Sequence, residues 1–195
     1  MLNNRIAIGA AQFGGFPYGV SNDGSTKVSY AEISNILTYA KSVGVNTIDT
    51  AITYGVSETR LGNFDVSNND VITKLPEIPK NCHDISSWVE KNLEDSLVRL
   101  KLPKVYGLLV WNINDLFGSR GLELLTAMQS LKKKKLVHKI GYSVYACIDH
   151  SQIIIDDYFS LLDPVFSKIQ ECENGRDITS LLESPVSHST FKRLN

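Results

Sequence analysis

Residues 45–62 read VNTIDTAITYGVSETRLG, and the rest of the chain is interpreted outward from this stretch. The segment 46–50 has the β-branched and apolar composition of a strand. A loop that contains Tyr54 follows, and residues 57–62 predict a short helix with its own N-cap and a terminal glycine. A strand that leads through a loop into a helix is the first half of a βαβ unit. Asp49 and Tyr54, which can both exchange protons, lie at the carboxyl end of the strand.

The alternation of strand and helix continues on both sides of this stretch. Strands are predicted over 6–9, 46–50, 71–74, 104–111 and 139–144, with a weaker signal over 165–170. Helices are predicted after a capping box at 29–32, over 57–62, over 85–100 behind Asp84 and over 122–131, and more weakly over 153–159 and 178–182. Gly44 stands where the end of a helix favours positive φ. Repeated βα units predict a parallel sheet.

Two architectures fit this pattern. One is a TIM (β/α)8-type barrel, incomplete at five to six βα units; the other is an open parallel α/β sheet. The length of 195 residues favours the open sheet, because a barrel typically needs about 250 residues. The placement of chemically active residues at strand ends favours the barrel. We expect residues 1–183 to form the partial barrel and residues 184–195 an irregular tail.

Composition excludes several classes of partner. Lys and Arg number 20 and Asp and Glu 21, a net charge of −1, so no basic excess predicts binding to nucleic acid or an anionic membrane. No apolar run approaches the roughly 18 residues of a membrane span. The three cysteines form no CxxC pair, which is typical of a reducing compartment and predicts a cytoplasmic protein. We expect no metal site.

The residues at the strand ends suggest acid–base chemistry. Reading along the chain, they are Asp49, Tyr54, Lys74, Trp111 and Ser143. A phenol with a pKa near 10 donates protons poorly at neutral pH, but a neighbouring ammonium group lowers that pKa and a carboxylate can hold the ammonium group. Such a phenol can protonate a carbonyl oxygen while a nicotinamide delivers hydride to carbon.

Five segments in order carry a resemblance to a known family. They read GAAQFGGFPYGVSN, VNTIDTAITYGVSETRLG, VITKLP, LEDSLVRL with KVYGLLVWN, and LKKKKLVHKIGYSVY. The chain resembles the aldo/keto reductases, and most closely a bacterial branch with a similar Gln-Phe-Gly loop. The resemblance implies a (β/α)8 barrel that reduces aldehydes and ketones with NADPH, bound without a Rossmann fold.

The resemblance also implies roles for particular residues. Tyr54 would be the general acid, Lys74 would lower the pKa of the phenol, and Asp49 would hold Lys74 and line the cofactor. Ser143 and Gln170 would orient the nicotinamide. Gln12, at the end of the first strand, is a further candidate for facing the cofactor. The expected partner is a small carbonyl substrate.

The chain departs from the family pattern in two places. Trp111 stands where the family places a catalytic histidine, and an indole can donate one hydrogen bond but cannot accept one or titrate. No segment after Gln170 resembles the seventh and eighth strands, so we expect a C-terminally truncated member with weakened or lost NADP binding. The alternative function is a catalytically silent interaction module or a non-functional product. Open barrel edges would favour self-association.

Overall fold

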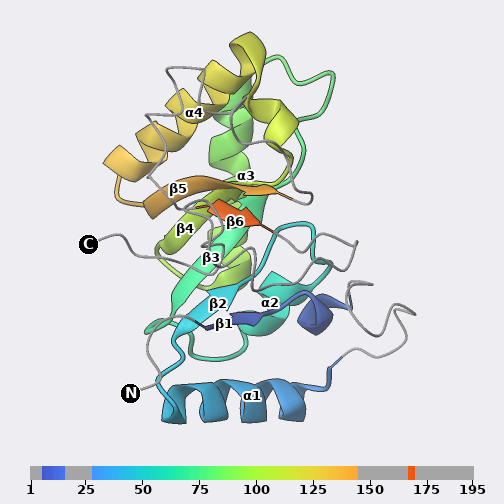
Figure 1. The fold of residues 1–195 in the computed structure, drawn as a ribbon, viewed down its shortest axis with the longest axis vertical. Coiled ribbons are helices and arrows are strands. Elements are labelled where there is room, and N and C mark those ends of the chain that lie inside the picture. Colours follow the sequence, from blue (N-terminus) through green and yellow to red (C-terminus); the bar gives the residue numbers. More distant parts are fainter. Residues whose placement is uncertain (1–5, 16–27, 145–166, 170–195) are drawn as a thin grey trace, which may run out of the picture.

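The computed structural model describes residues 6–15, 28–144 and 167–169, which form a six-stranded parallel sheet with helices beside it (Figure 1). The strands are β1 (Ala7–Gly9), β2 (Thr47–Asp49), β3 (Asp70–Leu75), β4 (Val105–Val110), β5 (Val137–Val144) and β6 (Ser167–Ile169). The helices are α1 (Tyr30–Ser42), α2 (Ser57–Leu61), α3 (Ile85–Leu100) and α4 (Gly118–Lys133), with 3-10 turns η1 (Gln12–Gly14) and η2 (Ile113–Leu116). In Figure 1, α1 lies at one end of the molecule and α4 at the other.

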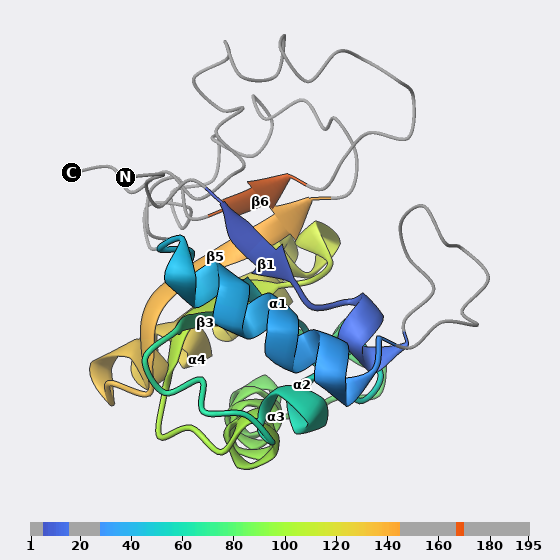
Figure 2. The same cartoon turned by 90° about the horizontal axis from the view of Figure 1, so that it is seen from below.

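The order of the strands decides between the two predicted architectures. The sheet runs β1-β2-β3-β4-β5-β6, so every strand pairs in parallel with its neighbour in sequence. A doubly wound sheet instead has its first strand in the interior and helices on both faces. Here α1, α2 and α3 lie on the same side of the sheet (Figure 2). The fold is therefore part of a (β/α)8-type barrel, and a doubly wound open sheet is excluded for the described residues.

One hydrophobic core joins the sheet to its helices. In register across the sheet, Leu108 of β4 pairs with Ile140 of β5, and both are fully buried. They pack with residues from all four helices, namely Ile33, Leu61, Val89, Leu93, Leu125 and Met128. Because side chains alternate along a strand, the residues next to these core positions face away from the helices.

Local sequence signals explain most of the element boundaries. The capping box of α1 is confirmed: the Ser29 hydroxyl accepts from the Glu32 N–H, and the Glu32 carboxylate accepts from the Ser29 N–H. Gly44, just beyond the C-cap residue Val43 of α1, has φ of +79°, and the predicted positive φ at this position is confirmed. Asp84 caps α3 by accepting from the Ser87 N–H.

The predicted N-cap of α2 is wrong. The N-cap position is Val56, without a capping side chain, and Ser57 is already the first helical residue. The Ser57 hydroxyl instead donates to the carbonyl oxygen of Ala10 at 2.7 Å. The Ser57 hydroxyl therefore makes a tertiary contact with the residue that follows β1, although the local sequence predicts that it caps α2.

Several expectations lie outside the described residues: the helices over 153–159 and 178–182, the domain limit at residue 183, the tail over 184–195, and Gln170. Within the predicted sixth strand at 165–170, β6 is confirmed at its centre. No helix in the described ranges is long and apolar enough to cross a membrane.

Candidate active site

Sheet register brings four of the predicted site residues to one face. Asp49 is the last residue of β2, and Lys74 of β3 is in register with Leu109 of β4, which in turn is in register with Gly141 of β5. Trp111 and Ser143 each lie two residues beyond that row. Two residues along a strand restore the same orientation, so these side chains belong to the face of the sheet opposite the helices. This face is the inner side of a barrel, at the carboxyl ends of its strands.

A buried ion pair forms the base of the site. The Lys74 ammonium group lies 2.8 Å from Asp49 Oδ1 and also donates to the carbonyl oxygen of Thr50 at 2.8 Å. Lys74 is fully buried and Asp49 is 3% exposed. Two charged groups can be buried away from water only when they are paired and hydrogen-bonded. The burial of the Lys74 ammonium group therefore requires the Asp49 carboxylate, and the reverse also holds.

Tyr54 lies against the same ammonium group. Its hydroxyl oxygen is 3.5 Å from Lys74 Nζ, and Nζ is 4.8 Å from the centre of its ring. Tyr54 is 2% exposed. Asp49, Lys74 and Tyr54 are therefore assembled as the sequence predicted, with the ammonium group between carboxylate and phenol.

Trp111 packs against the ring of Tyr54. The two rings meet edge-on, with centroids 5.6 Å apart and planes inclined at 80°. Trp111 also packs on the small cluster that Ala11, Ala51 and Tyr54 form apart from the main core. The structure thus places Trp111 beside the phenol of Tyr54. This is the position at which the family resemblance implies a catalytic histidine.

Two glycines allow the loops of the site to approach closely. A Cβ on Gly14 would lie 1.7 Å from the carbonyl oxygen of Tyr54, and one on Gly55 would lie 2.8 Å from the carbonyl oxygen of Gly14. Gly55 also has φ of +57°, which side-chain-bearing residues rarely adopt. The backbone of η1 therefore packs directly on the backbone around Tyr54, and this contact holds the tyrosine at the carboxyl ends of β1 and β2.

A buried carboxylate, which the sequence reasoning missed, supports the site from the helix side. Glu58 of α2 accepts hydrogen bonds from the hydroxyls of Thr73 and Ser96, each at 2.6 Å, and from Arg99 Nε at 2.7 Å. Thr73 is the neighbour of Lys74 in β3. Glu58 thereby ties α2, β3 and α3 together. Sequence offers only a weak signal for it, because an acidic residue in the first helical turn is ordinarily solvated.

The predicted cofactor residues occupy separate positions. Ser143 is 3% exposed in β5, and its hydroxyl makes no hydrogen bond within the described residues. Gln12 begins η1, three residues after the end of β1, and is half-buried. Gln170 is outside the described residues.

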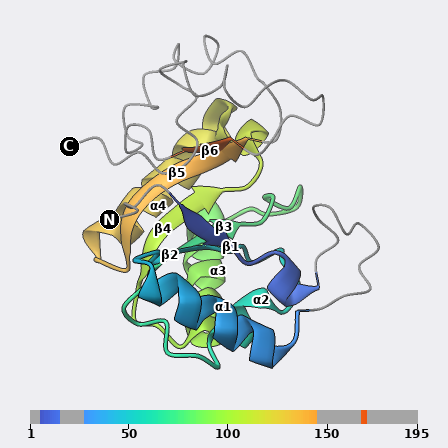
Figure 3. The same ribbon diagram turned by 60° about the horizontal axis from the view of Figure 1, so that its bottom comes forward.

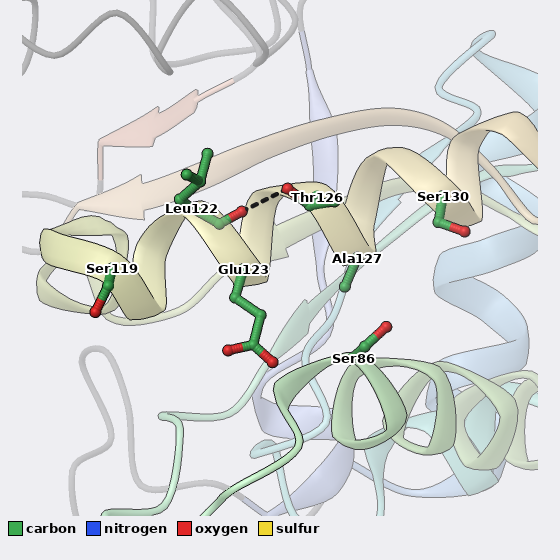
Figure 4. Close-up of a pocket in the computed structure, with 7 residues that line it drawn as sticks. All are labelled: Ser86, Ser119, Leu122, Glu123, Thr126, Ala127 and Ser130. Atoms are coloured by element: carbon green, nitrogen blue, oxygen red, sulfur yellow. Dashed lines mark hydrogen bonds between the residues drawn. The ribbon is translucent and has the colours of Figure 1, made fainter.

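A groove of about 480 Å³ lies elsewhere, between α3 and α4 (Figure 4). Its lining consists of Ser86, Ser119, Leu122, Glu123, Thr126, Ala127 and Ser130. The one carboxylate among them, on Glu123, accepts from the Ile85 N–H at 3.2 Å and so completes the start of α3. The groove is formed by helices on the side of the sheet opposite to Lys74, and it shares no residue with the candidate site.

Comparison with known proteins identifies the family. Residues 5–171 match the model of the aldo/keto reductase family. The chain belongs to the aldo/keto reductases. A comparison with curated protein sequences gives no match.

Solved aldo/keto reductase structures share the fold of this family member. PA4992 from Pseudomonas aeruginosa is 27% identical over 72% of this chain and 55% of its own, with a TM-score of 0.59. AKR11C1 from Bacillus halodurans is 17% identical over 86% of this chain and 53% of its own, with a TM-score of 0.62. AKR2E4 from Bombyx mori, solved with NADP, is 21% identical over 85% of this chain and 54% of its own, with a TM-score of 0.58. The chain thus spans about half the length of these relatives.

Proposed function

We propose that this chain binds NADPH and reduces a small aldehyde or ketone, with Tyr54 as the general acid. The observation that carries the proposal is the Lys74 ammonium group, 2.8 Å from Asp49 Oδ1 and 3.5 Å from the Tyr54 hydroxyl oxygen. All three side chains are almost completely buried. Water therefore competes weakly for these groups, and their electrostatic interactions are stronger than in solvent.

Each residue of this group has a chemical role. A cation beside a phenol favours the phenolate, so Lys74 makes Tyr54 a better proton donor to a carbonyl oxygen. Asp49 balances the charge of Lys74 and fixes the ammonium group in position. The proton that leaves the Tyr54 hydroxyl goes to the substrate oxygen as carbon accepts hydride.

The residues near the strand ends fit the nicotinamide end of the cofactor. The Ser143 hydroxyl, which makes no hydrogen bond to another described residue, would donate to the carboxamide, and Gln12 and Asp49 lie at the carboxyl ends of β1 and β2. NADPH, when bound, supplies the hydride. These residues orient the ring and exclude water from it.

Calorimetric titration with NADPH tests the binding step. We expect saturable binding, weakened by Ser143→Ala about tenfold because one hydrogen bond is lost. Ser130→Ala, in the groove between α3 and α4 on the other side of the sheet, is the matched control and should leave binding unchanged. If folded protein gives no heat at millimolar NADPH, the cofactor proposal fails.

The chemical step is tested by following NADPH oxidation with a small aldehyde. Tyr54→Phe removes only the hydroxyl, so it should retain NADPH binding and abolish turnover. Turnover that survives in Tyr54→Phe would assign the proton transfer to another group.

The contact of Trp111 with Tyr54 favours a second candidate function, a catalytically silent binding module. An indole cannot accept a hydrogen bond or titrate, so it cannot assist proton transfer as a histidine would. This function predicts NADPH binding by wild-type protein without oxidation of NADPH by any small aldehyde or ketone. Measurable turnover would exclude it.

A further inference from the structure

We propose that Arg60 is a positioning residue of the candidate active site. Its guanidinium group fixes η1, the turn that packs on the backbone of Tyr54 and carries Gln12. Arg60 itself contacts neither substrate nor cofactor and acts through η1. The role of Arg60 toward Gln12 rests on the proposed function, whereas its role toward the backbone of Tyr54 does not depend on NADPH.

Arg60, in α2, is a buried arginine whose donors bind backbone carbonyl groups. It is 7% exposed; Nη1 donates to the carbonyl oxygen of Phe13 at 2.6 Å, and Nη2 donates to that of Val28. Its Cζ lies 4.5 Å from the centre of the Tyr30 ring. Phe13 belongs to η1, Val28 lies just before α1, and Tyr30 is the first residue of α1. One guanidinium group therefore joins α2 to η1 and to the start of α1, which lie side by side in Figure 3.

The charge of Arg60 is buried without a carboxylate partner among the described residues. Buried charges are costly unless they are hydrogen-bonded, and apolar side chains of similar volume often fill buried space equally well. An arginine adds a planar fork of charged donors, which fixes the direction of the groups that it binds. We therefore infer that Arg60 orients the backbone of η1, a task that an apolar side chain could not perform.

α2 holds η1 at two points on either side of Gln12. The Ser57 hydroxyl donates to the carbonyl oxygen of Ala10 at 2.7 Å, and Arg60 donates to that of Phe13. Ser57 and Arg60 are three residues apart, so they lie on the same face of α2. The Phe13 N–H donates to the carbonyl oxygen of Ala10 at 3.1 Å, which closes the turn around Gln12. Two side chains of one helical turn thus fix the backbone that carries Gln12.

The contact of η1 with Tyr54 starts at the residue after Phe13. A Cβ on Gly14 would lie 1.7 Å from the carbonyl oxygen of Tyr54, so the two backbones touch. Ala11, the N-cap residue of η1, belongs to the small apolar cluster of Tyr54 on which Trp111 packs. A shift of η1 would therefore disturb both the backbone of Tyr54 and the packing of Trp111.

Tryptophan fluorescence tests the position of η1 without NADPH. The chain has two tryptophans, so Trp88→Phe leaves Trp111 as the only indole. In this background, Arg60→Met should shift the emission of Trp111 to longer wavelength and increase its quenching by iodide, because a displaced η1 admits water to the indole. Arg120→Met is the matched control: Arg120, on α4, also donates to a backbone carbonyl, that of Pro79 at 2.8 Å, and its loss should leave the emission unchanged.

Arg60→Lys is a second variant, which serves if Arg60→Met does not fold. Lysine keeps the charge but lacks the planar fork, so it cannot hold both carbonyl groups in the geometry of Arg60. Its emission should lie between those of the parent and Arg60→Met. Circular dichroism and cooperative unfolding verify that each protein is folded.

Calorimetric titration with NADPH tests whether Arg60 acts through Gln12. Arg60→Met and Gln12→Ala should each weaken NADPH binding about tenfold, because each removes the same hydrogen bond to the cofactor. The double variant should bind no more weakly than either single variant, since the loss through Gln12 occurs only once. A loss of affinity caused by general destabilisation would instead add to that of Gln12→Ala.

Two outcomes would overturn the proposal. If Trp111 emission in the folded Arg60 variants matches that of the parent, η1 is held in place without the guanidinium group. If the losses of NADPH affinity add in the double variant, Arg60 does not act through Gln12. A wild-type protein that binds no NADPH overturns the proposed function instead, and the emission of Trp111 then decides the role of Arg60.

Discussion

The indole of Trp111 meets the phenol of Tyr54 edge-on, with ring centroids 5.6 Å apart. The residue that departs from the family pattern is therefore in direct contact with the proposed general acid. Its effect on chemistry is local to the phenol, so substitution at residue 111 tests it separately from cofactor binding.

Trp111→His is expected to raise turnover of a small aldehyde by tenfold or more, since a positioned acid–base group typically contributes at least that much. Trp111→Phe, which keeps an aromatic ring without a titratable nitrogen, should show no gain. The measurement is the rate of NADPH oxidation, with NADPH affinity determined in parallel. Unchanged turnover at unchanged affinity would show that the indole is not what limits the reaction.

Lys74→Met should destabilise the fold by about 3–5 kcal/mol, because it leaves the Asp49 carboxylate buried without its partner. Lys91→Met breaks only the exposed pair with Asp95 and should cost less than about 0.5 kcal/mol. Adding Asp49→Asn to Lys74→Met should recover part of the loss. Denaturant unfolding measures all four proteins, and equal losses for the two lysine variants would contradict the buried pair.

Gly14→Ala should destabilise the protein by about 2 kcal/mol or more, since the new methyl group would lie 1.7 Å from the carbonyl oxygen of Tyr54. Gly9→Ala is the control, because nothing lies within 4 Å of a Cβ at that position. Thermal unfolding distinguishes them. Similar melting temperatures for both variants would mean that η1 does not pack on the Tyr54 backbone.

Asp115 should make stability depend on pH. Burial raises the pKa of this carboxyl group, although its Oδ2 accepts from the Ile78 N–H at 3.0 Å. The folded state therefore holds its proton more tightly than the unfolded state, whose pKa is near 3.9, and stability falls as pH rises through the folded pKa. Asp115→Asn, which cannot ionise, should gain stability relative to wild type as pH rises from below about 4 to neutrality.

Asp84→Asn should change the pH dependence of stability in the direction opposite to Asp115→Asn. Hydrogen bonds from the backbone N–H and hydroxyl of Ser87 lower the pKa of Asp84, so its contribution is present above the unfolded pKa and lost in acid. This variant should therefore lose stability relative to wild type as pH rises. If the stability of the two variants changes with pH in the same way, the assigned directions of the two pKa shifts are wrong.

The sequence by itself determined the βα alternation and the site residues at the strand ends. Hydrophobic spacing, the capping box at Ser29 and the glycine at residue 44 are local signals that act within a few residues. Asp49, Tyr54 and Lys74 could be placed together because parallel strands end at one edge of a sheet.

The tertiary structure decided what depends on contacts between distant segments. The consecutive strand order, the role of Ser57 in bonding Ala10 instead of capping α2, and the burial of Glu58 among Thr73, Ser96 and Arg99 join segments far apart in the chain. No local sequence pattern predicts these contacts, because Ser57 and Glu58 would be solvated if the distant segments did not pack against them. The sequence predicted that Asp49, Tyr54 and Lys74 lie together, and the packing of β2, β3 and α2 decided the distances between their side chains.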